Sequence, residues 1–384
     1  MHPDRLIRLA RIATIVGAAG ALLTIVGWIL DPRQAAFSWL AALAFWLSIA
    51  LGALLLVMIH HAINASWFIV LRRYAEVAAE TVVVLALLWI PIAAAIRAIY
   101  PWTGAPGPDI QAKRVYLNVP FFLVRGVLYF AIWIAAARLL SRWSEAMQNA
   151  DDARRVMLAQ RLRVFSAALL PAVAFALTFA SFDWLMSLSP DWYSTVFGVY
   201  WFAGGFLAAL AVLGVMGALT NAGSASAIST SHVHALGKLM LTFVIFWAYI
   251  GYAQLLLIWI ADIPAEAAWY VSRLNTRWSA VGAILLIGHF TLPLLALLSR
   301  ELKRRRRLLA ITSIWLLVMH YIDIYWLVLP ALHPAGPAPH WLDVTTFAAV
   351  GGFSVAFAAW RLRHRPLIPE GDPRLERSIR FVTR

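Results

Sequence analysis

The chain has 384 residues, of which 62% are hydrophobic and only 13% are charged, and its formal net charge is +14. Because a soluble domain carries about 25% charged residues, this composition excludes a soluble globular protein. Cysteine is absent, which excludes thiolate metal sites, cysteine-ligated iron–sulfur clusters, disulfides and covalently attached haem.

Ten apolar runs succeed one another along the chain, each long enough to cross the ~30 Å hydrocarbon core of a bilayer as a helix. The predicted helices are 12–30, 37–59, 81–99, 120–140, 165–186, 195–219, 239–260, 279–298, 308–329 and 344–360. We therefore predict an all-α polytopic membrane protein with a single membrane domain over 1–384. Its helices lie between about 12 and 360, and 361–384 form a basic cytoplasmic tail.

Basic residues predict the orientation of these helices. Twenty-five of the 32 Lys and Arg lie at the N-terminus, in every second connection and in the tail, whereas six lie in the other connections. The positive-inside rule then places both termini in the cytoplasm. Since this asymmetry accounts for the net charge, we interpret it as a topology and lipid-headgroup signal, with no nucleic-acid partner.

Tryptophans cluster near the predicted outer ends of the helices, where the simplest interpretation is an interfacial aromatic belt. The alternative is that some of them line a site near the outer face or pack against a partner. They are Trp28, Trp39, Trp102, Trp184, Trp192, Trp259, Trp269, Trp278, Trp326 and Trp341.

The ninth predicted helix carries His320 and Asp323, three residues apart and hence on one face. A charge at this depth is costly, so it needs a partner or a purpose. The pair can relay a proton or bind a quinol hydroxyl, or the histidine is a hydrogen-bonded core residue. His289 lies at similar depth in the eighth helix.

Polar residues near the predicted outer face form a second candidate group. Arg125, six residues into the fourth helix, either reaches the headgroups or pairs with an acid on a neighbouring helix. Asp183 and Trp184 end the fifth helix, and Asp191 and Trp192 follow in a connection without Lys or Arg. These residues predict a quinol site, a docking surface for a partner subunit, or a solvated turn.

A third group lies at the predicted cytoplasmic face. His60 and Glu80 flank the end of the second helix, and His232, His234 and Lys238 precede the seventh. Each set alone is an ordinary hydrated helix end, and together they form a candidate mouth of a proton path.

Several runs resemble a known family. They are SFDWLMSL at 181–188, DWYSTVFGVY at 191–200, LGKL at 236–239, FWAY at 246–249, QLLLIW at 254–259 and IDIYWLV at 322–328. Over roughly 62–330 the chain resembles the ActF-type, NrfD-like (polysulfide-reductase-type) membrane subunit of bacterial alternative complex III, a quinol:electron-acceptor oxidoreductase.

The resemblance implies a pair of four-helix bundles plus two extra helices in the bacterial cytoplasmic (inner) membrane. It implies no covalently bound cofactor, a dissociable quinone or quinol at most, no metal site, and haem and iron–sulfur clusters only in partner subunits. Those partners are a second NrfD-like membrane subunit, an iron–sulfur/molybdopterin-like subunit and multihaem cytochrome c subunits, with a terminal oxidase as a further candidate.

The resemblance also implies proton-path roles for matching residues, namely Asp183, His232, His234, Lys238 and Asp323. The chain departs from the family at Ala235, where an acid is usual. This departure weakens the prediction of a complete half-channel for protons at the cytoplasmic side.

The predicted function is an integral membrane subunit of a quinol-oxidising respiratory electron-transfer complex. The chain would anchor redox subunits and contribute a quinol site or a proton path, without being a complete enzyme. One alternative is an autonomous transporter, a class that ten helices and scattered polar residues suit. Pro91, Pro171 and Pro293 interrupt three helices, but they form no matching pair of the kind that transporters show. The other is a haem b cytochrome that uses His289 and His320 as axial ligands.

Overall fold

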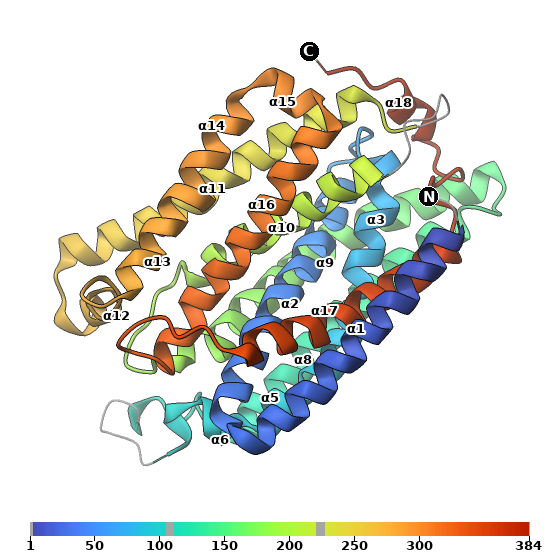
Figure 1. Ribbon diagram of the computed structural model, residues 1–384. Helices are drawn as coiled ribbons and strands as arrows, with labels where there is room; N and C mark the ends of the chain where they lie inside the picture. The colour runs from blue at the N-terminus through green and yellow to red at the C-terminus, as the bar shows by residue number, and fades with distance from the viewer. Residues whose placement is uncertain (1–2, 105–110, 220–226, 384) are drawn as a thin grey trace.

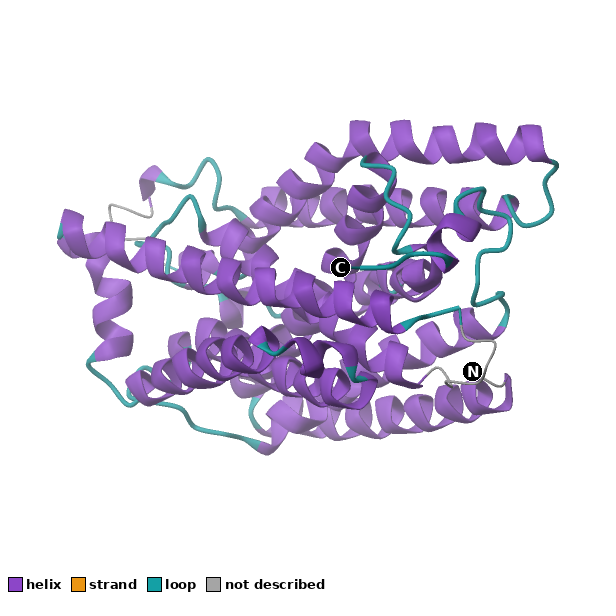
Figure 2. Ribbon diagram, turned by 90° about the horizontal axis from the view of Figure 1, so that it is seen from above, coloured by secondary structure: helices purple, strands orange, loops and turns teal. Residues whose placement is uncertain are grey.

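The computed structural model describes residues 3–104, 111–219 and 227–383. Within these ranges all regular structure is helical, without a strand. Ten helices are long and apolar enough to cross a membrane. The prediction of an all-α polytopic membrane protein is therefore confirmed, and Figures 1 and 2 show the long helices running side by side.

Eight spans are continuous and two are broken. The continuous spans are α1 (Pro3–Leu30), α2 (Pro32–Ala62), α8 (Val119–Ala146), α9 (Asp152–Trp184), α10 (Phe197–Leu219), α11 (Thr230–Ala261), α16 (Arg306–Val328) and α17 (Trp341–Arg363). The third span is divided into α3 (Ile69–Glu80), α4 (Val82–Leu88) and α5 (Ile90–Ala94), followed by α6 (Ile96–Ile99) and η1 (Pro101–Thr103). The eighth consists of α13 (Trp278–Leu285), a π-helical turn η3 (Leu286–Thr291) and α14 (Leu292–Leu298).

Shorter helices lie between the spans and in the tail. They are η2 (Met186–Leu188), α12 (Pro264–Leu274), α15 (Arg300–Arg304), η4 (Leu329–Ala331) and α18 (Leu375–Ile379).

Local capping chemistry fixes where several spans begin. Asp31 accepts a hydrogen bond from the Gln34 amide at 3.0 Å, and Pro32 occupies the first turn of α2. Asn118 caps α8 in the same way, through the amide of Phe121. A short polar side chain before a first-turn proline both stops the preceding segment and starts the next helix.

Helix α2 is the centre of the molecule. It is buried along almost its whole length and packs against α3, α9, α10 and α17. Helix α10 approaches it especially closely at Gly52. A Cβ at this position would lie only 2.4 Å from the carbonyl oxygen of Gly205 in α10. Such small residues let membrane helices approach closely.

Two groups of neighbouring helices lie on either side of this centre. Helices α2, α3, α8 and α9 contact one another, as do α10, α11, α14 and α16, while α1 packs along α17. Because α2 also packs along α10, the division into two four-helix bundles stays a prediction.

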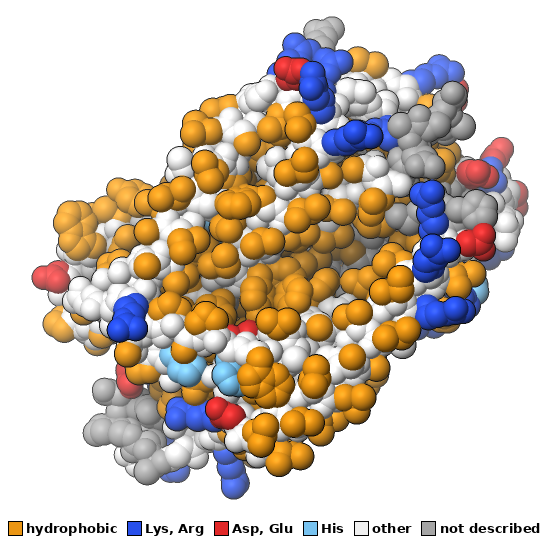
Figure 3. Space-filling view, in the orientation of Figure 1, with side chains coloured by type: hydrophobic (Ala, Val, Ile, Leu, Met, Phe, Trp, Pro, Cys, Tyr) orange, Lys and Arg blue, Asp and Glu red, His pale blue; other side chains and the backbone are white. Residues whose placement is uncertain are grey.

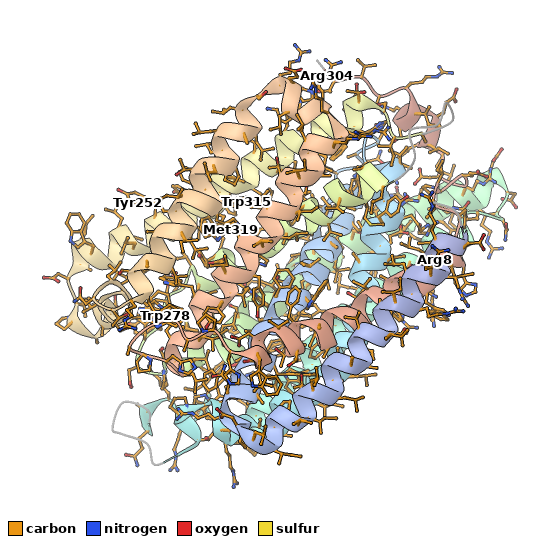
Figure 4. The ribbon with its side chains drawn as sticks, in the orientation of Figure 1. Arg8, Tyr252, Trp278, Arg304, Trp315 and Met319 are labelled. Carbon is orange, nitrogen blue, oxygen red and sulfur yellow. The ribbon has the colours of Figure 1, made fainter. Side chains whose placement is uncertain are left out.

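Both described ends of the chain lie at one end of the bundle (Figure 1). Lys and Arg gather at this end, including the labelled Arg304, and an apolar band separates it from the end that holds Trp278 (Figures 3 and 4). We call the first the basic end and the second the opposite end.

Several predicted helix starts differ from the structure, and two differ most. The third span begins at Ile69, not 81, because the charges of its first turns are buried in ion pairs and need no solvent. Helix α9 begins at Asp152, not 165, since its basic first turns extend as an exposed helix at the basic end.

The predicted tryptophan belt is wrong for most of its members. Six are buried within the chain, namely Trp39, Trp102, Trp184, Trp192, Trp269 and Trp278. Only Trp259 and Trp341 are well exposed. The tryptophans instead form aromatic clusters that pack the opposite end of the bundle.

Candidate functional site

The buried carboxyl group of Asp323 lies at the centre of the candidate site. Tyr200 of α10 donates a hydrogen bond to Oδ1 at 2.5 Å, and Trp247 of α11 donates to Oδ2 at 3.1 Å. The side chain is 1% exposed. Its close polar neighbours are neutral donors and His320, so the acid has no Arg or Lys partner among the described residues.

His320 continues the site toward α2. Its Nε2 lies 2.8 Å from the Ser48 hydroxyl, and that hydroxyl donates to the Phe45 carbonyl at 2.7 Å. Ser48 must therefore accept from His320, which assigns the ring proton to Nε2. The other nitrogen, Nδ1, lies 3.9 Å from Asp323 Oδ2 and has no hydrogen-bond partner among the residues that the structure describes.

Glycine 204 of α10 makes room for this pair. A Cβ there would lie 2.9 Å from His320 Cε1 and 3.5 Å from Asp323 Oδ2. The absence of a side chain lets α10 and α16 approach closely at the level of the acid.

His289 lies on the far side of Trp247, in the π-helical turn η3. Its ring centre is 4.2 Å from that of Trp247 and 6.3 Å from that of His320. The ring is fully buried, and neither nitrogen has a hydrogen-bond partner in the described part of the chain. Buried groups left unpaired cost free energy, so such an exception points to function or to water.

The π-helical turn that holds His289 is stabilised by α16. Trp315 donates to the carbonyl of Gly288 at 2.7 Å, and a Cβ at Gly288 would lie 2.6 Å from the sulfur of Met319. Trp315 and Met319 lie between α16 and the eighth span in Figure 4. Single π turns are frequent at functional sites, because they re-aim one side chain within a helix.

The structure places the residues of the predicted outer group in separate clusters. Arg125 pairs with Asp183 through Nε–Oδ2 at 2.8 Å and Nη2–Oδ1 at 2.7 Å, and Tyr129 donates to Oδ2 at 2.8 Å. Of the two roles predicted for Arg125, the structure has the pair with an acid. Asp183 is fully buried and its oxygens are occupied, which disfavours it as an acceptor of a quinol proton.

Trp184 and Trp192 belong to different aromatic clusters. Trp184 packs on Trp89, Phe130 and Trp133. Trp192 stacks on Trp269 of α12, with ring centres 4.5 Å apart and planes 14° apart. The structure therefore does not bring the two rings into one site.

The segment around Trp192 binds α12 of the same chain. Gln254 receives a hydrogen bond from Ser194 at 2.9 Å and donates to Tyr270 at 2.8 Å. The Arg273 guanidinium lies 3.6 Å from the centre of the Trp269 ring. Burial lowers the pKa of Arg273 to about 9, so it remains a cation at neutral pH. Asp191 is exposed beside this cluster.

At the basic end, both carboxylate oxygens of Glu80 form ion pairs. Its carboxylate pairs with Arg361 at 2.6 Å and with Arg365 at 2.8 Å. Glu80 therefore fastens the tail to α3, a role that the sequence did not indicate.

A second buried network joins the tail to α3. Arg72 pairs with Asp372 and with Glu76, and Glu76 also pairs with Arg73 at 2.7 Å. Beside it lie the buried rings of His60 and His61, and neither nitrogen of His61 has a hydrogen-bond partner among the described residues.

The tail also reaches the start of α11. His232 Nε2 lies 3.0 Å from the Ser378 carbonyl, and Lys238 donates to Thr383 at 2.8 Å. His234 is buried beside them. The structure thus brings both predicted basic-end sets to one end of the bundle, where the folded tail binds Glu80, His232 and Lys238.

The structure contains one further polar cluster that was not predicted from the sequence. Near the opposite end, Ser38 donates to Asp343 Oδ1 at 2.5 Å, and Gln34 contacts both Ser38 and His333. The only sequence signal was the pair Gln34 and Ser38, one helical turn apart. Tyr200 and Trp247 were also missed as site residues, although both lie in the runs that carry the family resemblance.

The packing around His289 and His320 does not favour a haem between them. His320 Nε2 is bonded to Ser48, and Trp247 covers His289. In the described ranges no group of three or more His, Asp or Glu is arranged to hold a metal ion.

No model of a known protein family matches the chain, and no curated protein matches it. The family resemblance therefore rests on the sequence runs alone.

Proposed function

We propose that the chain is an integral membrane subunit of a quinol-oxidising complex of the alternative complex III type, and that Asp323 exchanges protons within it. The observation that carries this proposal is a fully buried acid without a cation partner, beside a histidine with a free Nδ1. An intramembrane acid without a counter-charge is costly, and such residues mark proton relays in membrane proteins.

The geometry supports proton exchange between Asp323 and His320. A proton on Asp323 Oδ2 faces the lone pair of Nδ1, and a small movement that shortens the 3.9 Å separation completes the hydrogen bond. Tyr200 and Trp247 stabilise the carboxylate once the proton has left. Both states of the acid are then satisfied, which a relay requires.

Direct contact with quinol is less favoured at this site. Asp323 and His320 are each 1% exposed, so a quinone ring reaches neither without displacing a helix. The chain has no cysteine for a cluster or attached haem. We therefore assign the electrons to partner subunits and only protons to this one.

In the proposed orientation the basic end faces the cytoplasm of a bacterium and the opposite end faces outward. Between Ser48 and His60, helix α2 carries only apolar residues and Gly52. A proton that travels from the basic end to His320 must therefore cross this stretch on transient water or after a helix movement.

A transporter is the alternative, and the helix breaks speak against it. Discontinuous transporter helices meet at the substrate site. Here α5 contacts α2, α4 and α6, whereas η3 contacts α11, α13, α14 and α16. The two breaks therefore pack mainly against different helices in the described part of the chain.

Purification of the tagged chain from its native membrane tests the proposal. We expect it to bring down, in fixed ratio, a multihaem cytochrome c, an iron–sulfur subunit and a second NrfD-like subunit, with haem that quinol reduces. A homogeneous preparation of this chain alone, without haem that quinol reduces, would contradict the proposal.

A further inference from the structure

Helices α1 and α17 pack along each other and meet most closely at a pair of glycines. A Cβ at Gly352 would lie 2.4 Å from the backbone nitrogen of Gly17, and one at Gly17 would lie 3.0 Å from that of Phe353. Between this contact and the basic end, a groove of about 450 Å³ runs between the helices.

Apolar and basic residues line this groove together. Ile7 and Arg11 line it from α1, and on α17 Trp360 and Arg363 lie nearer the basic end than Ala356 and Phe357 do. Trp360 is 44% exposed, as expected for an indole at the headgroup level of a bilayer.

The two arginines of the groove have no acidic partner. Neither Arg11 nor Arg363 pairs with an Asp or Glu in the described part of the chain, although both are exposed. Arg363 donates through Nε to His364 at 2.7 Å, which leaves its two terminal nitrogens free of that bond.

We propose that this groove binds one anionic phospholipid of the leaflet at the basic end. Its phosphate lies between Arg11 and Arg363, and one acyl chain follows the apolar wall that Ala356 and Phe357 form on α17. Two cations beside an apolar groove match a lipid that has both a negative headgroup and a hydrocarbon chain. The site requires only that the chain is embedded in a membrane, whatever its part in quinol oxidation.

A transmembrane helix of a partner is the competing occupant. It would fill the apolar wall but would need acidic residues at the headgroup level to neutralise both arginines. Acidic residues near a membrane surface are repelled by anionic lipid, so the lipid itself is the simpler counter-charge.

Lipid binding by the full chain, purified with any subunits that accompany it, tests the proposal. Native mass spectrometry would follow retention of phosphatidylglycerol and of phosphatidylcholine in the wild type and in R11Q/R363Q. We expect the wild type to retain phosphatidylglycerol preferentially. We expect R11Q/R363Q to bind it about 30-fold more weakly, as the loss of two cations near a headgroup implies.

The matched control is R304Q/R307Q, which removes two exposed arginines from the same end but away from the groove. We expect it to retain phosphatidylglycerol as the wild type does, and we expect both variants to keep the wild-type thermal stability in phosphatidylcholine. Equal retention by R11Q/R363Q and wild type, or equal loss in the control, would overturn the proposal. A photo-crosslinker at Phe357 that labels a polypeptide instead of lipid would also overturn it.

Discussion

Arg125 of α8 and Asp183 of α9 form a bidentate ion pair inside the membrane-spanning part of the chain, with N–O distances of 2.8 and 2.7 Å. The rings of Tyr116 and Phe121 lie 3.9 and 4.2 Å from the guanidinium carbon. Each charge is therefore compensated locally. The pair ties α8 to α9 and leaves no free carboxylate at Asp183 for chemistry.

Removal of one partner should destabilise the protein strongly. Asp183→Asn leaves a buried guanidinium uncompensated, which costs about 3–5 kcal/mol. We expect a large fall in the free energy of unfolding in detergent, and an unchanged KM for quinol in whatever complex assembles. Asp191→Asn, at an exposed acid eight residues later, should change neither quantity. A stable Asp183→Asn protein with a raised KM would instead place a quinol site here.

The folded tail depends on the buried carboxylate of Asp372, which binds Arg72 and lies 3.0 Å from Arg374. Asp372→Asn should release the tail, because Arg72 then keeps Glu76 of its own helix as its only acidic partner among the described residues. We expect trypsin to cleave after Arg374 several-fold faster than in the wild type. Glu376→Gln, which breaks an exposed pair with Arg380, should leave the cleavage rate unchanged. Equal rates in both variants would show that the Asp372 pair does not hold the tail.

Acid should weaken the same contact only at low pH. Burial raises the pKa of Asp372, but Arg72 and Arg374 outweigh burial and hold it well below its usual range. A depressed folded-state pKa stabilises above the unfolded value of about 3.9 and is lost as pH falls through the folded value. The difference in unfolding free energy between wild type and Asp372→Asn should stay constant from about pH 8 to 5 and shrink below about pH 4. A difference that vanishes near neutral pH would contradict this assignment.

The orientation can be tested because the chain has no cysteine of its own. Asp191 and Asp152 are exposed at opposite ends of the bundle. In intact cells, an impermeant maleimide should label Asp191→Cys at once and Asp152→Cys only after lysis. Labelling of both from the same side would contradict the proposed topology.

The spans were predictable because a helix that crosses a bilayer needs a long apolar run, and such a run is continuous in the sequence. Asp323 and His320 were predictable for a similar reason, since two polar residues three apart share a helix face. Their partners were not, because Tyr200 and Trp247 are 123 and 76 residues away from Asp323. Only the packing of α10 and α11 against α16 brings them together.

The errors have the same origin in long-range contacts. The charges of α3 suggested a hydrated connection, yet Arg72 also binds Asp372 of the tail, 300 residues later. The tryptophans suggested a lipid interface, yet most of them pack against one another. In each case the residue type was informative, and the identity of its neighbour was not available locally.

Proton-coupled turnover of the assembled complex carrying Asp323→Asn is the most direct test of the proposed relay. Asparagine keeps the shape and can accept the hydrogen bond from Tyr200, so we expect normal assembly. We expect proton-coupled turnover in liposomes to fall by about a hundredfold, while Asp343→Asn, at another buried acid, keeps the wild-type rate. Wild-type turnover and proton stoichiometry in a fully assembled Asp323→Asn complex would contradict the account.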